Sequence, residues 1–531
     1  MALSPATDEV LVARGRLQMA DRTLDLTPAH GPNAIGVVDV GSNTARLVVF
    51  DASRSRVVRP IFEAKEIPRL GAHLSADGSL APEAIERGVE SLRRFAQTLR
   101  GLEVRRTLAV TTSAVRDAPN GREFVRAAER ATGILLRVLT GAEEARYGYL
   151  GVASAWELHN DLVVDLGGGS LQVVETRKGL LANSVSLPLG GLRLTQRFIA
   201  HDPPKDRELE DLRDEVRGSI HSTLTAFAGG EYRVFAMGGT VRAVARAAIE
   251  LREYPIPRVH GYAIRQHDLD ALRGLVAELP TGKRRAIPGI GQERADVIDA
   301  GLVVLTELLR VSKASEILVT GTGIREGLAL EAIDASLPAS AEALADRSVE
   351  AAAERFTFSI DRGREVADLA SQLFDLLAPA REWGASERLA LRVAAQMHDA
   401  GVSIDLWRHA HHSAYLIRNY PIWGLTHRET LLAATIVALH AGDDLPSGLR
   451  KGLQPVLRSG DPGLARRLSA LLQLAGLLAP AGPKFALSAS GEALAVTFTS
   501  PPATTLPPRA VEKSKKPIER ELGLEVRFRD G

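Results

Sequence analysis

The sequence predicts an α/β protein of two lobes with a similar plan, followed by an all-helical domain and a small C-terminal subdomain. The first observation is a pattern that occurs twice: an apolar strand ending in an aspartate, a glycine-rich turn closing on a hydroxyl, and a second apolar strand. The copies surround Asp39 and Asp165, about one domain length apart. The second observation is that strand-like runs alternate with helical patterns only up to about residue 338. The repeat indicates an internal duplication, with a ligand in the cleft between the lobes.

The composition is that of an ordinary globular protein. Of the 531 residues, 45% are hydrophobic and 25% are charged, and the formal net charge is +1. A basic field over the whole protein therefore cannot attract a polyanion, and we expect no nucleic-acid partner. The absence of cysteine excludes disulfides and fits a cytoplasmic protein. No apolar run is long enough to span a membrane.

The first lobe is expected over residues 34–155. Residues 1–33 lack the apolar core of a secretory signal and contain acids, so we expect a flexible N-terminal tail. Two strands flank the turn at Gly41, and apolar residues at helical spacing predict a helix over 82–99. The other expected elements are a strand over 107–112, a helix over 124–131, a strand over 135–139 and a helix beginning at Gly141.

The second lobe is expected over residues 156–338 and repeats this plan. Its first two strands form a hairpin, and two later buried strands each run into a glycine-rich turn. The expected strands cover 162–165, 171–175, 234–237 and 317–320, and the expected helices cover 207–227 and 295–309.

Residues 339–480 are expected to form the helical domain, and residues 481–531 a small C-terminal α/β cap. Apolar residues recur at helical spacing in the first of these regions, whereas the second has short strand-like runs at 494–497 and 524–528. The expected helices cover 364–377, 385–397, 413–418, 428–440 and 464–478.

The two glycine-rich turns are candidate phosphate-binding sites. Their backbone N–H groups can point at anionic oxygens, and glycine lets the backbone approach closely. Asp39 and Asp165, directly before the turns, are placed to hold a hard cation that bridges to phosphate. The turn residues expected to bind phosphate are Gly41, Ser42, Asn43, Gly167, Gly168, Gly169 and Ser170.

Two adjacent glutamates have different expected roles. Thr140 and Glu143 have the spacing of a capping box, which gives Glu143 a structural role. Glu144 is turned by about 100° from Glu143 on the helix, so it is free to face the cleft. A carboxylate near bound phosphate can position and activate a water molecule, and a surface carboxylate is the alternative.

Further arginines and turns could contact phosphate. Arg116 follows a strand and could fork onto phosphate oxygens, or it could pair with Asp117 or another acid. Arg193, after a glycine-rich turn, is open to the same two interpretations. Two more turns precede helices, where they either bind anions through the helix N-terminus or allow tight packing. They are Gly238–Gly239–Thr240 and 321–323.

Histidines and arginines are dense in the helical domain. Histidines near Asp399 could form a metal site, or they could cap helices and lie in solvated loops. The cationic residues could track a long polyphosphate, or they could form an ordinary solvated face. The histidines are His398, His411, His412, His427 and His440, and the cationic stretch comprises Arg408, His409, His411, His412, Arg418 and Arg428.

These motifs, in their order along the chain, resemble the exopolyphosphatase / guanosine pentaphosphate phosphohydrolase family of the actin-like, sugar kinase and Hsp70 ATPase superfamily. The resemblance implies two ribonuclease H-like lobes around a phosphate cleft, an HD-like helical domain and a homodimer. It also implies release of orthophosphate from the end of polyphosphate or from guanosine pentaphosphate, with Mg²⁺ or Mn²⁺ as the cofactor. The matching segments are 39–47, 111–120, 140–151, 163–170, 187–198, 237–241 and 294–301.

The resemblance also implies roles for single residues. The family's catalytic carboxylate falls on Glu144. Its metal-associated aspartate falls on Asp165, with Asp39 as the counterpart across the cleft. Arg116 matches the arginine that contacts phosphate, and Arg193 is a second such contact.

One departure from HD-type sites concerns the helical domain. Such sites begin with a histidine, where this chain has Arg362. A guanidinium does not deprotonate to become a metal ligand, so His398 and Asp399 would lack a partner. We therefore interpret the helical domain as a polyanion-binding or dimerising module and not as a second active site.

The predicted function is that of an exopolyphosphatase. A guanosine pentaphosphate 5'-phosphohydrolase acting in the stringent response is the nearest alternative, and a sugar or acetate kinase of the same superfamily is another. A non-catalytic sensor that binds polyphosphate or guanosine tetraphosphate belongs to a different class. The set of Glu144, Asp165, Asp39 and Arg116 favours an enzyme.

Overall fold

The structure is a computed structural model, and it forms two compact units. It describes residues 16–19, 22–25, 34–52, 58–72, 77–227, 230–442, 456–481, 485–490, 493–498 and 508–530. The first unit, here called the two-lobed unit, contains residues up to 154 together with 158–248 and 263–337. The second, here called the helical unit, contains 155–157, 249–262 and the chain from 338 onward. Each is described separately.

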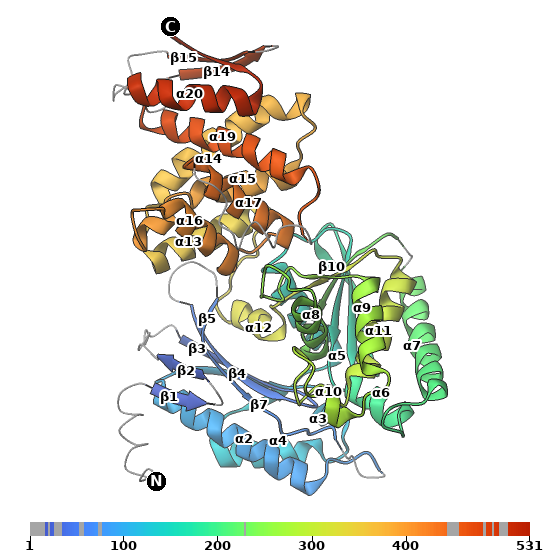
Figure 1. Ribbon diagram of the computed structural model, residues 1–531. Coiled ribbons are helices and arrows are strands. Elements are labelled where there is room, and N and C mark those ends of the chain that lie inside the picture. The colour runs from blue at the N-terminus through green and yellow to red at the C-terminus, as the bar shows by residue number, and fades with distance from the viewer. Residues whose placement is uncertain are drawn as a thin grey trace, which may run out of the picture. The chain divides into compact units, whose positions relative to one another are not determined.

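The first lobe has a five-stranded sheet in the order β5-β4-β3-β6-β7. β3, β4 and β5 are antiparallel, and β6 and β7 run parallel to β3. Helices α2 and α4 cover one face, where the sheet and these helices share an apolar core (Figure 1). The bounds are β3 Ala34–Val40, β4 Ala45–Asp51, β5 Arg59–Glu66, α2 Pro82–Gly101, β6 Arg106–Thr111, α4 Gly121–Thr132 and β7 Leu136–Val138.

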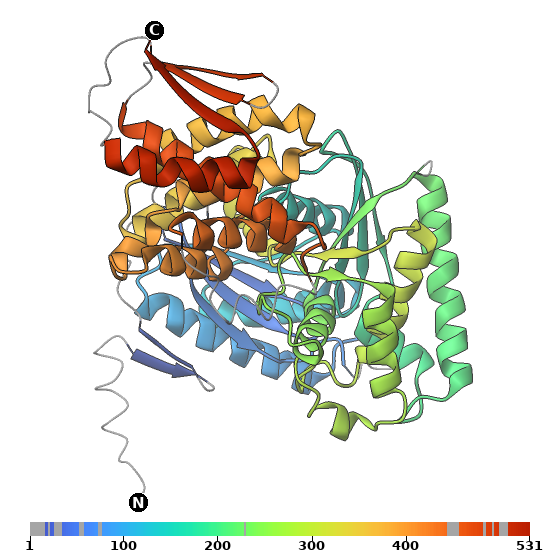
Figure 2. The same cartoon turned by 45° about the horizontal axis from the view of Figure 1, so that its top comes forward.

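The second lobe repeats this plan. Its sheet has the order β10-β9-β8-β11-β13-β12, with β8, β9 and β10 antiparallel and β11 and β13 parallel to β8. Helices α7 and α11 pack side by side on this lobe (Figure 2). The bounds are β8 Asp161–Leu166, β9 Leu171–Arg177, β10 Leu180–Leu187, α7 Asp206–Ala226, β11 Arg233–Met237, β12 Ala263–Ile264, α11 Ile298–Ser312 and β13 Ile317–Val319.

Helix α12 (Ile324–Ala332) packs on a different lobe from the one that it follows in the sequence. It follows the last strand of the second lobe, yet Ile324, Leu328 and Ala329 join the apolar core on the free face of the first-lobe sheet. It also packs along α5 (Gly141–Ala153), which in turn contacts strands of the second lobe. Residues 156–338 are consecutive in the sequence, but α12 near their end packs on the first-lobe sheet, because that sheet needs a helix on its second face.

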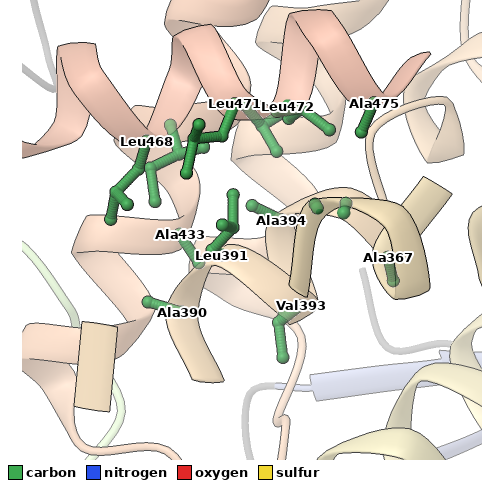
Figure 3. Close-up of a cluster of buried hydrophobic side chains, with 14 of the residues drawn as sticks. Ala367, Ala390, Leu391, Val393, Ala394, Ala433, Leu468, Leu471, Leu472 and Ala475 are labelled. Carbon is green, nitrogen blue, oxygen red and sulfur yellow. The ribbon is translucent and has the colours of Figure 1, made fainter. Parts of the chain in front are cut away.

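In the described part of the chain, the helices of the helical unit surround a core of small and branched apolar residues. Leu391 on α15 points toward Leu468 and Leu471 on α19 (Figure 3). A three-stranded sheet, β14-β15-β16, and helix α20 complete the unit. The bounds are α13 Ala341–Phe356, α14 Ile360–Leu377, α15 Ala385–Gln396, α16 His409–Asn419, α17 His427–His440, α19 Asp461–Leu478, β14 Phe485–Ser490, β15 Ala493–Phe498, α20 Pro508–Leu522 and β16 Glu525–Asp530.

The expected fold class is confirmed: two α/β lobes of matching topology precede a helical region and a small C-terminal sheet. Several elements were not predicted individually, among them β5, β10, α13 and α20. In the N-terminal tail, strands β1 (Arg16–Met19) and β2 (Arg22–Asp25) pair in a hairpin, and the rest of residues 1–33 lies outside the described residues. Among the described residues, no helix is both long and apolar enough to cross a bilayer.

Candidate active site

The two glycine-rich turns lie in contact between the lobes. Each is closed in the same way, since the N–H of Gly41 donates to the Thr44 carbonyl and that of Gly167 to the Ser170 carbonyl, both at 3.0 Å. A Cβ atom on Gly168 would lie only 3.2 Å from the Ser42 Cβ. The duplicated sequence thus folds into two facing turns, as the repeat predicts.

A pocket opens at these turns and collects most of the predicted site residues. It lies within the two-lobed unit. Four predicted residues do not line it: Gly169, Thr240, Arg116 and Arg193. Its lining includes Asp39, Gly41, Ser42, Asn43, Glu144, Asp165, Gly167, Gly168, Ser170, Gly238 and Gly239, together with Arg46, Thr112, Ser113, Arg242, Arg294 and Arg325.

Glu143 and Glu144 occupy different environments, as their spacing predicts. Thr140 Oγ1 accepts from the Glu143 N–H at 3.2 Å, and the Glu143 carboxylate accepts from the Thr140 N–H at 2.9 Å, which completes the capping box. Glu144 is buried and lines the pocket. Burial raises the pKa of Glu144 to about 7; the hydrogen bond from Arg116 opposes the increase, and the negative charges of Asp165 and Asp39 add to it.

Arg116 and Arg193 are engaged by acids. The Arg116 Nη1 donates to Glu144 at 2.8 Å and to the Leu139 carbonyl at 3.1 Å, and its Nε donates to Asp117 at 3.2 Å. Arg193 donates to the same Asp117 at 2.6 Å. The alternative interpretation, pairing with acids, describes both arginines here, so their contact with phosphate stays a prediction. Arg116 instead orients the carboxylate of Glu144.

Asp39 and Asp165 are half-buried carboxylates that line the pocket within electrostatic range of each other. Burial raises the pKa of Asp165 to about 6, Arg242 opposes this, and Asp39 adds to it. Burial also raises the pKa of Asp39, against the effects of Arg325, Arg46 and Arg242. Two carboxylates fit Mg²⁺, which keeps several waters and shares its remaining ligands with phosphate oxygens. The described residues contain no group of three or more acids, histidines or cysteines that could hold a metal by itself, and Mg²⁺ binding stays a prediction.

The pocket is also lined by four arginines that were not predicted from the sequence. Burial lowers the pKa of Arg242 to about 9, helped by the like charges of Arg46 and Arg325. Burial likewise lowers the pKa of Arg294 to about 10, although Glu293 opposes it. Buried, mutually repelling guanidinium groups have a high affinity for an anion that can neutralise them.

Local signals exist for two of these arginines. Arg242 and Arg325 each lie just after a glycine-rich turn, in the first turn of helices α8 (Gly239–Leu251) and α12. The sequence predicts both turns as possible anion sites, but it does not predict a role for the arginine that follows each of them. Arg46 sits on β4 directly opposite Asp39. Arg294 comes from an irregular segment, and nothing in its local sequence predicts its position.

In the helical unit, the Arg362 Nε lies 3.2 Å from the Asp399 Oδ2, and the His398 Nε2 lies 3.2 Å from the same oxygen. Asp399 is thus paired with a guanidinium, and the absence of a second active site in this domain stays a prediction. The expected cationic stretch is shorter than predicted. Arg428 pairs with Glu387 and Asp461, at 2.8 and 2.6 Å. His427, among the histidines considered for a metal site, is buried and hydrogen-bonded to the His260 carbonyl at 2.8 Å.

Comparison with known proteins identifies a family with the same fold. The model of the Ppx/GppA phosphatase family matches residues 48–336, and that of Ppx/GppA phosphatase domain III matches residues 344–480. An exopolyphosphatase from Cytophaga hutchinsonii is 26% identical, with a TM-score of 0.53, over 57% of this chain and 98% of the other. A Ppx/GppA family member from Aquifex aeolicus is 26% identical, with a TM-score of 0.49, over 56% of this chain and 97% of the other.

The fold and the family match define a phosphatase with two α/β lobes of matching topology. Its reaction class is hydrolysis at a phosphate group, for which the pocket supplies buried arginines and a carboxylate. The chain belongs to the Ppx/GppA phosphatase family. The resemblance stated from the sequence motifs is thereby confirmed.

Proposed function

We propose that this protein is an exopolyphosphatase, which hydrolyses the terminal phosphoanhydride bond of inorganic polyphosphate and releases orthophosphate in the presence of Mg²⁺. The observation that carries the proposal is the convergence of four arginines and Glu144 on one pocket between two glycine-rich turns. A pocket with this much positive charge suits a substrate group with several anionic oxygens. The name of the Cytophaga hutchinsonii relative supports polyphosphate as that substrate.

The residues have distinct roles in this proposal. The backbone N–H groups of the two turns, together with Arg46, Arg242 and Arg325, bind the oxygens of the terminal phosphoryl group and balance their charge. Glu144 orients a water molecule and accepts its proton as the water oxygen attacks phosphorus. The bond from phosphorus to the bridging oxygen breaks, and that oxygen remains on the shortened chain.

Arg116 acts through Glu144 in this scheme. Its hydrogen bond fixes the orientation of the carboxylate and limits the rise of its pKa, so that Glu144 can accept a proton near neutral pH. Asp39 and Asp165 would hold Mg²⁺, mostly through water. Bound Mg²⁺ would neutralise charge on the phosphoryl oxygens.

The test is orthophosphate release from long-chain polyphosphate and, separately, from guanosine pentaphosphate, with Mg²⁺ present. Release from polyphosphate by the wild type, with little release by Glu144→Gln, supports the proposal. Release from guanosine pentaphosphate alone would make the protein a nucleotide phosphatase. Binding of polyphosphate without any release would indicate a sensor.

A further inference from the structure

A row of side chains leads outward from the pocket across the first-lobe sheet. Asp39 on β3 lies opposite Arg46 on β4, and Arg46 lies opposite Lys65 on β5. Directly opposed residues on neighbouring strands point to the same face of a sheet. Lys65 therefore lies one strand farther out than Arg46, on the face that Arg46 presents to the pocket.

A second row leads outward on the other lobe. Arg242 on α8 lines the pocket, and Arg246 follows it by one helical turn on the same face of the helix. Arg246 is exposed, and its Nε donates to the Gly289 carbonyl at 3.4 Å. Cations thus continue beyond the pocket on both lobes.

The carboxylate of Glu293 lies where these two rows meet. It forms an ion pair with Lys65 across the two lobes, and its negative charge interacts electrostatically with Arg246. The next residue, Arg294, lines the pocket. Glu293 belongs to the irregular segment between α10 (Thr281–Arg284) and α11, and the Asn43 Nδ2 donates to its backbone carbonyl at 3.0 Å.

We propose that Lys65, Arg246 and Arg294 form an outer subsite for the phosphate groups that follow the reacting one in a polyphosphate chain, and that the Glu293 carboxylate fills this subsite in the free protein. A carboxylate and a phosphate group compete for the same cations. A chain substrate displaces Glu293, whereas a single phosphate in the inner pocket leaves it in place. Glu293 thereby sets the minimum chain length that binds well. This inference rests on the proposed function, since it deepens the specificity of the same site.

A neighbouring ion pair provides a matched control. Asp296, three residues after Glu293, also bridges the lobes, because it accepts from the Arg69 Nη1 at 2.8 Å. Neither Asp296 nor Arg69 lines the pocket. If the acids of this segment only hold the lobes together, Asp296→Asn and Glu293→Gln should have similar effects.

The experiment is calorimetric titration of the full-length protein with tripolyphosphate and with orthophosphate, without divalent cations. We expect Glu293→Gln to tighten tripolyphosphate binding roughly two- to fivefold, the range for one partly exposed charge pair, and to leave orthophosphate binding unchanged. Lys65→Met should weaken tripolyphosphate binding by a similar factor. In the double variant Lys65→Met/Glu293→Gln most of the gain should disappear, and Asp296→Asn should bind both anions as the wild type does.

Two results would overturn the subsite. Weaker binding of both anions by Glu293→Gln would mean that the ion pair with Lys65 holds the two lobes together for binding. Unchanged binding of tripolyphosphate would mean that Glu293 does not compete with the chain. Failure of the proposed function would look different. In that case Glu293→Gln would bind tripolyphosphate more tightly than the wild type does, yet the wild type would release no orthophosphate when Mg²⁺ is added. The subsite would then stand and the proposed hydrolase activity would not.

Discussion

The Arg116 Nη1 donates a hydrogen bond of 2.8 Å to the Glu144 Oε2 at the wall of the phosphate pocket. Glu144 is 5% exposed, and burial raises the pKa of its carboxyl group because it disfavours the charged form. The guanidinium of Arg116 opposes that effect, and the pKa settles at about 7. A group with this pKa is available both to accept a proton from water and to release it near neutrality.

Replacing Glu144 by glutamine should remove most of the turnover. Glutamine keeps the shape of the side chain but cannot accept a proton, and loss of a general base typically lowers the rate by about 10²- to 10⁴-fold. The measurement is orthophosphate release from polyphosphate, with circular dichroism to confirm folding. Glu143→Gln is the matched control, because Glu143 caps helix α5 outside the pocket. Glutamine at this position still completes the capping box, so this variant should change stability and turnover little; equal losses in the two variants would contradict this assignment.

The pH profile should report the same carboxylate. Because only the ionised form of Glu144 accepts a proton, kcat/KM should rise with pH and level off above an apparent pKa near 7. Arg116 lowers this pKa, so Arg116→Met should move the rising limb to higher pH. The profile would be measured with polyphosphate at constant ionic strength. A limb near the ordinary glutamate value, about 4.3, would assign the titration to another group.

Arg242 should lower the stability of the free protein and strengthen its binding of anions. In the described part of the chain it forms no ion pair, and burial lowers its pKa to about 9. Arg242→Met should therefore raise the melting temperature of the free protein, whereas it should increase the KM for polyphosphate several-fold. Orthophosphate should stabilise the wild type by about 2.7 kcal/mol at a hundred times its Kd, and the variant much less. Thermal melts with and without orthophosphate test this, and equal stabilisation of both proteins would place the anion elsewhere.

Gly190 should be essential for the second phosphate turn. A Cβ atom there would lie 2.3 Å from the carbonyl carbon of Gly169 and 2.4 Å from that of Gly168, and neither backbone atom can yield without moving the turn. Gly190→Ala should therefore lower turnover by at least tenfold. Gly218 in helix α7 is the control, since a Cβ there meets no atom within 4 Å. Gly218→Ala should preserve turnover and add about 0.5–1 kcal/mol of stability, because alanine favours the helix. Unaltered turnover in Gly190→Ala would show that the turn tolerates displacement.

Much of the site could be predicted because its signals are local in the chain. The turns after Asp39 and Asp165 need glycine and a flanking strand, and these requirements are written in consecutive residues. The capping box at Thr140 fixes the start of helix α5, and the rotation between successive helical residues then separates Glu144 from Glu143. The two-lobe plan follows from the repeat of these patterns.

The tertiary structure alone decided the charge balance of the pocket. Arg46, Arg242, Arg294 and Arg325 come from four different segments, and no spacing along the chain brings them together. The same holds for helix α12, which follows a second-lobe strand but covers the first-lobe sheet. Burial, repulsion between like charges and the pairing of Glu293 with Lys65 depend on distances through space. The sequence by itself therefore determined which turns can hold phosphate, and the packing of the two lobes decided which charged groups meet there.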